Sequence, residues 1–153
     1  MTVITVDYAV FMTQYHNITD QQSIGTDGLG PCIGIVAHKK DNTVFCAHLA
    51  CSIVPSNADN IKLITEKSKT VLTPYLNSKD VSTIFYVSGN PRDKSADAMF
   101  QGLQAVYGAN TLNTGNGVYW DKKLKTAIAT GAQTIVGTTK GPQDDNGPIE
   151  VKK

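Results

Sequence analysis

The sequence lacks the features that mark a nucleic-acid-binding protein or a membrane protein. Only 18% of its 153 residues are charged, the formal net charge is +1, and Lys and Arg form no cluster that could follow a phosphate backbone. No apolar run approaches the ~20 residues that span a bilayer, and residues 1–7 carry no basic region of a Sec signal peptide. We therefore expect no nucleic-acid partner, no membrane insertion, and a cytoplasmic protein or one delivered to a host cytosol without such a peptide.

Cysteine is also scarce, and its spacing argues against two structural roles. The chain has three cysteines, an odd number without a framework spacing, which favours a reducing compartment and a free thiol. Cys46 stands near His48, but the sequence has no Cys-x-x-Cys pair and no His-x3-His pair, so zinc is not indicated. A chain of this length can bury its own core without such cross-links. We expect one domain over residues 1–140, a monomer, with no metal and no cofactor.

Two short apolar runs predict an antiparallel hairpin. They cover residues 32–38 and 43–51 and are separated by the turn-rich residues 39–42. If the pairing is centred on this turn, Cys32 lies opposite or diagonal to His48, with roughly 5–8 Å between their Cβ atoms. The register decides this contact, because a slip of one residue would turn His48 to the other face.

The same alternation separates the histidines of the hairpin. His38 shares the face of Cys32, but it lies six residues away, about 20 Å along a strand that rises ~3.3 Å per residue. His48 is therefore the candidate base for the Cys32 thiol. His16 lies in the polar stretch 13–17, where we expect a solvated loop.

Cys32 and His48 are the parts of a thiol nucleophile and its base. A neighbouring imidazolium lowers the pKa of a thiol and populates the thiolate near neutrality, and His48 would then pass a proton to the leaving amine. Thr26, six residues before the cysteine, could turn back to orient the imidazole through its hydroxyl or its carbonyl. We expect the Cys32 N–H to be one oxyanion donor, because Pro31 has no N–H.

Three glycines surround the candidate nucleophile. Gly28 and Gly30 form the turn before Cys32, where we expect the oxyanion and the substrate to lie. Gly34 shares the face of the cysteine, and its missing side chain would leave room for a substrate to approach.

Each of these residue types also has an ordinary structural role. A cysteine in an apolar strand is commonly inert core, which we expect for Cys46 and Cys51 and which remains an alternative for Cys32. A strand histidine is commonly a polar neighbour, and Gly-x-Gly by itself is a tight turn. A non-catalytic protein-binding module is therefore an alternative to an enzyme.

The pattern Thr26-x-Gly28-Leu29-Gly30-x-Cys32, followed by an apolar strand and His48, resembles the catalytic signature of the chemoreceptor glutamine deamidases (CheD). It is also similar to the Thr-x5-Cys…His skeleton of the cytotoxic necrotizing factor and Burkholderia lethal factor toxins, which deamidate glutamines of host proteins. The resemblance implies a layered fold and a triad of a cysteine nucleophile, a histidine base and an orienting threonine.

The resemblance is strongest over residues 22–55. Two departures from the family's pattern bear on which protein is the substrate more than on the chemistry. Pro31 stands where the family usually has a serine, and residues 48–51 lack the family's usual His-x-Met-Leu-Pro continuation. Elsewhere, residues 88–90 and 114–117 stand where that family has glycine-bearing turns.

The remaining elements predict an α+β fold, a layered sandwich of mostly antiparallel strands with two main helices packed on the sheet. A polar, flexible tail is expected over residues 141–153. The predicted helices cover residues 56–77 and 94–107, and the predicted strands cover residues 2–11, 81–88, 117–121, 124–130 and 133–138.

Together these features predict a cysteine-dependent amidohydrolase that deamidates an exposed glutamine of a partner protein, with Cys32, His48 and Thr26 as its triad. A signalling deamidase and an effector toxin are both consistent with the sequence. A thiol transglutaminase or peptidase, which would share the acyl-enzyme, is the enzymatic alternative.

Overall fold

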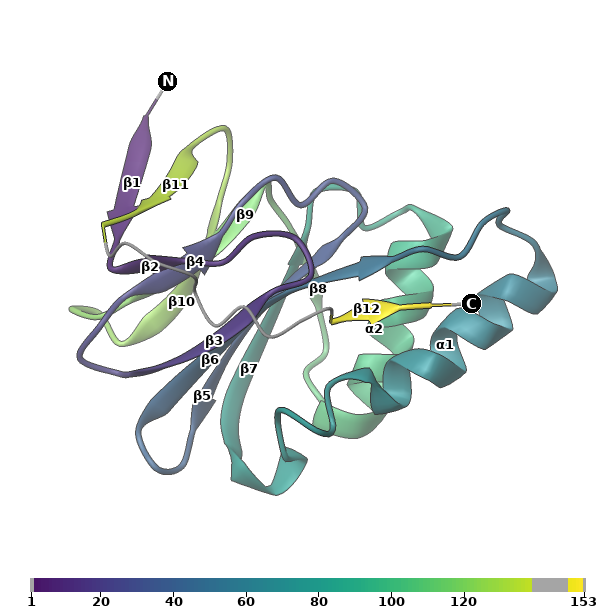
Figure 1. Cartoon of the computed structure of the whole chain (residues 1–153), viewed down its shortest axis with the longest axis horizontal. Helices are drawn as coiled ribbons and strands as arrows, with labels where there is room; N and C mark the ends of the chain where they lie inside the picture. The colour runs from purple at the N-terminus through teal and green to yellow at the C-terminus, as the bar shows by residue number, and fades with distance from the viewer. Residues whose placement is uncertain (1, 139–148, 153) are drawn as a thin grey trace.

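The computed structural model describes residues 2–138 and 149–152 and shows the predicted α+β architecture (Figure 1). The elements follow in the order β1 (Val3–Val6), β2 (Tyr8–Ala9), β3 (Tyr15–Thr19), β4 (Ile24–Thr26), β5 (Ile33–Lys39), β6 (Thr43–Cys51), α1 (Ala58–Val71), a 3₁₀ turn (Ser78–Asp80), β7 (Val81–Ser88), α2 (Lys94–Tyr107), β8 (Leu112–Thr114), β9 (Gly117–Asp121), β10 (Thr126–Thr130), β11 (Thr134–Gly137) and β12 (Glu150–Val151).

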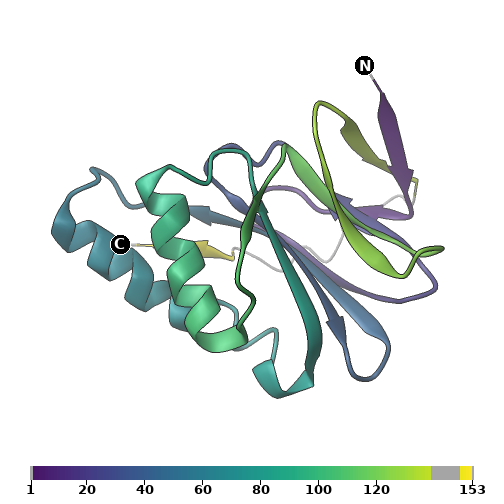
Figure 2. The ribbon, with the colours of Figure 1, turned by 180° about the vertical axis from the view of Figure 1, so that it is seen from behind.

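The elements form layers around the β5–β6 hairpin. The largest sheet has the order β12-β6-β5-β7-β8, with β3 also paired to β6, and a second sheet has the order β10-β9-β4-β2. Helices α1 and α2 lie side by side against one face of the large sheet, as both views show (Figures 1 and 2). The second sheet covers the other face, and the parallel pair β1–β11 lies beyond it.

Side-chain alternation in the hairpin explains this layering. Odd-numbered residues such as Ile35 and Phe45 belong to the core under the helices. Even-numbered residues such as Val36 and Cys46 belong to the core between the two sheets. Because both faces are covered, the strands are apolar on both sides, which is why the sequence shows continuous apolar runs.

The hairpin and the helices agree closely with the sequence predictions. Strand β5 pairs with β6 in the antiparallel sense, with Gly34 opposite His48. Helix α1 begins after Asn57, whose side chain accepts a hydrogen bond from the Asn60 N–H. It ends at Val71 rather than at residue 77, before Pro74, which cannot continue a helix.

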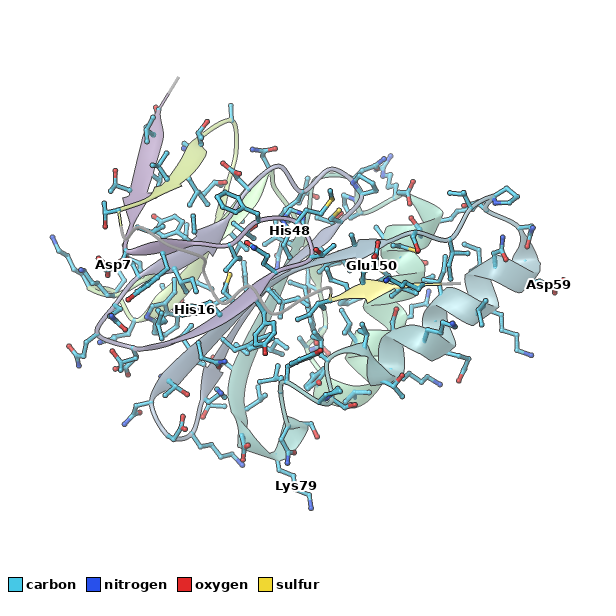
Figure 3. The ribbon with its side chains drawn as sticks, viewed as in Figure 1. Asp7, His16, His48, Asp59, Lys79 and Glu150 are labelled. Carbon is cyan, nitrogen blue, oxygen red and sulfur yellow. The ribbon has the colours of Figure 1, made fainter. Side chains whose placement is uncertain are left out.

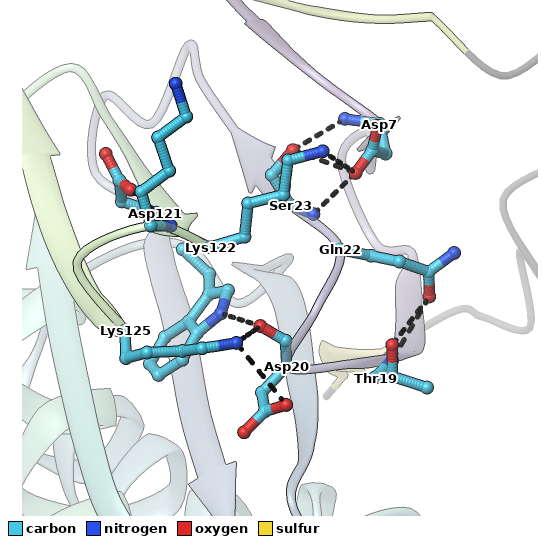
Figure 4. Close-up of polar contacts among 10 residues, drawn as sticks. Asp7, Thr19, Asp20, Gln22, Ser23, Asp121, Lys122 and Lys125 are labelled. Atoms are coloured by element: carbon cyan, nitrogen blue, oxygen red, sulfur yellow. Dashed lines mark hydrogen bonds and ion pairs between the residues drawn. The ribbon is translucent and has the colours of Figure 1, made fainter.

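Three expectations for the N-terminal region are corrected. The strand predicted over residues 2–11 is divided into β1 and β2 at Asp7, whose carboxylate accepts hydrogen bonds from the Ser23 N–H and hydroxyl (Figure 4). The expected polar loop contains β3, which pairs with β6. His16 lies in that strand, half-buried, with its ring 4.7 Å from the ring of Tyr8, and not in a solvated loop.

Residues 149–151, near the end of the chain, belong to the core. β12 pairs with β6 in parallel, with Glu150 opposite Ala50, and the side chains of Ile149 and Val151 are buried. The flexible tail predicted over residues 141–153 is therefore wrong for residues 149–152, whereas residues 141–148 and 153 lie outside the described part. In the described ranges, neither helix is long and apolar enough to cross a membrane.

Candidate active site

Thr26 and His48 are brought together between the two larger sheets, and Cys32 packs against the same core. Thr26 ends β4 of the second sheet, Cys32 immediately precedes β5, and His48 lies in β6. The side chain of Thr26 is 1% exposed and that of His48 is 3% exposed, whereas Cys32 is half-buried. The nucleophile candidate is thus the member of the set that solvent can reach.

Thr26 orients the His48 ring through its hydroxyl. Its Oγ1 donates to the Val10 carbonyl at 2.9 Å and lies 2.7 Å from His48 Nδ1. A hydroxyl has one proton to donate, so Oγ1 must accept the second hydrogen bond, and Nδ1 must carry the proton. The predicted contact between residues 26 and 48 is confirmed, and it is the hydroxyl rather than the carbonyl that makes it.

This tautomer leaves His48 Nε2 as an unprotonated nitrogen. Nε2 is buried and makes no hydrogen bond with any described residue, Cys32 included. Burial lowers the pKa of His48 to about 4, although the negative charge of Asp27 opposes this shift. The imidazole is therefore neutral at pH 7 and can accept a proton at Nε2.

Cys32 packs on the same side of the hairpin as His48. Gly34 is opposite His48, and Cys32, two residues earlier and just before β5, packs against the core between the two sheets. Burial raises the pKa of the Cys32 thiol, with a smaller contribution from Cys51.

These pKa shifts correct the predicted protonation states. The sequence predicted a thiolate beside an imidazolium, but burial disfavours the charged form of both Cys32 and His48. The folded protein therefore holds a thiol and a neutral imidazole. A reaction at Cys32 requires the thiol proton to move to Nε2 as the sulfur attacks.

The turn before Cys32 needs its two glycines. Gly28 and Gly30 have φ values of +65° and +46°, a region that residues with a side chain rarely adopt. The Cys32 N–H donates to the Leu29 carbonyl at 2.6 Å within this turn. The prediction that this N–H serves the oxyanion is therefore wrong in this conformation, because the donor is already in use.

Gly34 has a packing role and does not open a path for substrate. A Cβ atom on Gly34 would lie 2.8 Å from Val118 Cγ1 and 3.1 Å from both methyl carbons of Leu29. The space that the sequence assigned to substrate is filled by these two buried side chains. Gly34 lets Leu29 insert between the sheets, and this fixes the turn that precedes Cys32.

Two further turns, residues 88–90 and 114–117, form hydrogen bonds with the turn that precedes Cys32. The sequence did not reveal this role. The Gly30 carbonyl accepts hydrogen bonds from the Asn90 N–H at 2.8 Å and from the Ser88 hydroxyl at 3.2 Å. The Leu29 N–H donates to the Asn116 carbonyl at 3.0 Å. The available signal was the pair of glycine-bearing turns 88–90 and 114–117, which the resemblance had already singled out.

His38 lies at the other end of the hairpin, as predicted, and has different partners. Its Nε2 is 3.4 Å from Asp20 Oδ2, and its ring centroid is 4.8 Å from that of Trp120. Asp20 also accepts a hydrogen bond from Lys125, whose Nζ lies 2.6 Å from the Asp20 carbonyl oxygen (Figure 4). Within residues 2–138 and 149–152, no cluster of His, Cys, Asp and Glu side chains could hold a metal ion.

Comparison of the chain with protein-family models found no match, and comparison with curated proteins found none.

Proposed function

We propose that this protein is a cysteine-dependent amidohydrolase that deamidates glutamine side chains of a partner protein. One observation carries the proposal. The hydrogen-bonded chain from His48 Nδ1 through the Thr26 hydroxyl to the Val10 carbonyl leaves Nε2 as a buried base without a partner among the described residues. This base lies on the side of the hairpin that carries Cys32.

The reaction follows from these protonation states. The Cys32 thiol gives its proton to His48 Nε2 as Sγ attacks the carboxamide carbon, forming a C–S bond. The C–N bond then breaks, and the proton on Nε2 leaves with ammonia. Water, deprotonated by Nε2, attacks the thioester, and the proton returns to sulfur as glutamate is released. The balance is one water consumed and one ammonia produced for each glutamine.

Thr26 is a positioning residue in this scheme. Its hydroxyl accepts from Nδ1–H and keeps Nε2 free, and it also stabilises the imidazolium that forms when Nε2 takes the proton. The order and spacing of Thr26, Cys32 and His48, which resemble those of the deamidases named above, support glutamine as the amide. A signalling deamidase and an effector toxin would share this chemistry.

Two observations favour a non-catalytic binding module. The pKa of the Cys32 thiol is raised, and Nε2 makes no hydrogen bond to its sulfur. In that case Cys32 only packs, and its replacement changes binding surfaces but no covalent chemistry.

Mass spectrometry of lysate proteins incubated with the purified chain separates these functions. Deamidation adds about one mass unit at a glutamine and releases ammonia, and both changes should vanish in Cys32→Ala but persist in Cys51→Ala, the matched half-buried cysteine. Conversion that persists in Cys32→Ala, or no conversion in bacterial and animal lysates, would contradict the proposal. Cross-linked glutamine–lysine products or cleaved chains would instead indicate a transglutaminase or a peptidase.

A further inference from the structure

A tight turn between β2 and β3 presents two large apolar side chains to solvent. Phe11 and Met12 are adjacent in the chain, and their side chains are 67% and 61% exposed. Single exposed hydrophobic residues are ordinary. An aromatic ring and a thioether side by side on one turn form a small apolar surface, which we call the Phe11–Met12 turn.

Hydrogen bonds attach this turn directly to the candidate active site. The Thr13 N–H donates to the His48 carbonyl at 2.9 Å, and the His48 N–H donates to the Gln14 carbonyl at 3.0 Å. Just before Phe11, the Val10 carbonyl accepts the Thr26 hydroxyl. The turn therefore continues the β3–β6 pairing to His48, which lies beside this loop in Figure 3.

The conformation of the turn is strained and closely determined. Thr13 has φ +68°, a left-handed conformation that is unusual and unfavourable for a β-branched residue. Three contacts hold it: the Gln14 N–H donates to the Phe11 carbonyl, the Ile149 N–H donates to the Thr13 carbonyl, and the Phe11 N–H donates to Gln14 Oε1. Phe11 and Met12 are therefore displayed on a backbone with little freedom.

We propose that the Phe11–Met12 turn is a docking surface for the protein substrate and contacts an apolar side chain within a few residues of the target glutamine. This inference rests on the deamidase function proposed above. The position of the turn selects the occupant, because its backbone is bonded to His48 and Thr26 while its two apolar side chains face solvent, where a polypeptide bound at the site can contact them.

The chemistry of the two side chains fits a polypeptide partner. Aromatic residues and methionine are enriched in protein interfaces, and the flexible thioether of Met12 can adapt to different apolar side chains. Because the backbone is already ordered, binding there loses little conformational entropy. An exposed pair suits a side chain presented by a macromolecule better than an enclosed small molecule.

Two blocked pentapeptides test this proposal, one with leucine and one with serine on both sides of a central glutamine. The wild type should release ammonia from the leucine peptide with a kcat/KM about tenfold or more above that for the serine peptide, because only a leucine side chain can bury apolar surface against the turn. The double variant Phe11→Ser/Met12→Ser should reduce this preference to within about twofold.

Leu124→Ser is the matched control. Leu124 is 66% exposed in the turn between β9 and β10, so its replacement removes a similar apolar surface away from His48. This variant should keep the preference of the wild type, and circular dichroism should show that all three proteins are folded. Equal rates on the two peptides in the wild type, or a preference that survives in the double variant, would overturn the docking surface while leaving deamidation intact.

A binding measurement separates this failure from failure of the deamidase proposal. If neither peptide releases ammonia in a Cys32-dependent way, fluorescence anisotropy of the labelled peptides with Cys32→Ala still reports docking. Tighter binding of the leucine peptide, lost when Phe11→Ser/Met12→Ser is added, would support the docking surface without the chemistry. Equal binding of both peptides, or binding unaffected by the added substitutions, would overturn it.

Discussion

His38 and His48 lie at opposite ends of one hairpin and on the same face of it, but their partners differ in charge. His38 faces the carboxylate of Asp20 across 3.4 Å and packs against Trp120. His48 faces the neutral hydroxyl of Thr26, and its second nitrogen has no partner among the described residues. A buried hydroxyl fixes the tautomer and leaves a neutral base.

The comparison shows how one scaffold gives two histidines different surroundings. The difference does not come from the strands, which give both residues the same orientation. It comes from what the second sheet and its loops place opposite each ring: Asp20 and Trp120 at one end, Thr26 and the Val10 carbonyl at the other.

The largest expected difference between the two histidines is in turnover. His48→Ala removes the base and should lower the rate of glutamine deamidation by about 10²–10⁴-fold. His38→Ala should change it by less than about threefold, because its ring lies at the far end of the hairpin. Ammonia release by both variants, with circular dichroism as the folding control, checks this. An essential His38 with a dispensable His48 would invert the assignment.

The protonation states predict the reactivity of Cys32. Because the pKa of its thiol is raised, alkylation by iodoacetamide should rise about tenfold per pH unit, or about 100-fold from pH 6 to pH 8. The measurement uses Cys51→Ser, which removes the other half-buried thiol, while Cys46 is fully buried. A rate that is already high and flat from pH 5 to pH 8 would indicate a thiolate–imidazolium pair instead.

His48 should also make stability depend on pH. Its pKa is about 4 in the folded protein and near 6.5 in an unfolded chain. Between these values the unfolded state binds more protons, so the free energy of unfolding falls as pH decreases. The loss from this group between pH 7 and pH 5 is about 2 kcal/mol.

Urea unfolding at both pH values measures this contribution, with His48→Gln as the reference variant. The wild type should lose about 2 kcal/mol more than His48→Gln. Equal losses in the two proteins would mean that His48 titrates at its ordinary pKa when folded.

Two buried threonines provide a matched test of the Thr26 hydroxyl. Thr26→Val leaves the Val10 carbonyl and His48 Nδ1–H without a partner, so it should destabilise the fold by roughly 1–2 kcal/mol and lower turnover. Thr26→Ser should restore both. Thr130 is also buried, but its Oγ1 makes no hydrogen bond with any described residue. Thr130→Val should therefore be neutral or stabilising, and equal destabilisation by both valines would contradict the role of the Thr26 hydroxyl.

The smallest effect is expected at the contact between Asp20 and His38. Asp20→Asn removes a partly exposed pair and should cost less than about 1 kcal/mol in the free energy of unfolding. Turnover and the alkylation profile of Cys32 should stay as in the wild type. A large change in either would show that the two ends of the hairpin are coupled.

The sequence by itself determined the hairpin and the face that Cys32 shares with His48. The alternation of side chains and the short turn after Lys39 fix these relations locally, and the register observed places Gly34 opposite His48, with Cys32 packed against the same core. The helices are also local features, because the Asn57 cap and the apolar stripes specify them.

The tertiary structure decided the chemistry of the site. Whether Thr26 uses its hydroxyl or its carbonyl depends on Val10, which lies 16 residues away in the chain. The filling of the space at Gly34 depends on Val118, and the neutral states of Cys32 and His48 depend on burial between two sheets. Strands β3 and β12 likewise exist because β6 provides their hydrogen-bonding partners. Contacts between distant segments and the burial that they create are not encoded in any local pattern, so only the assembled fold could supply them.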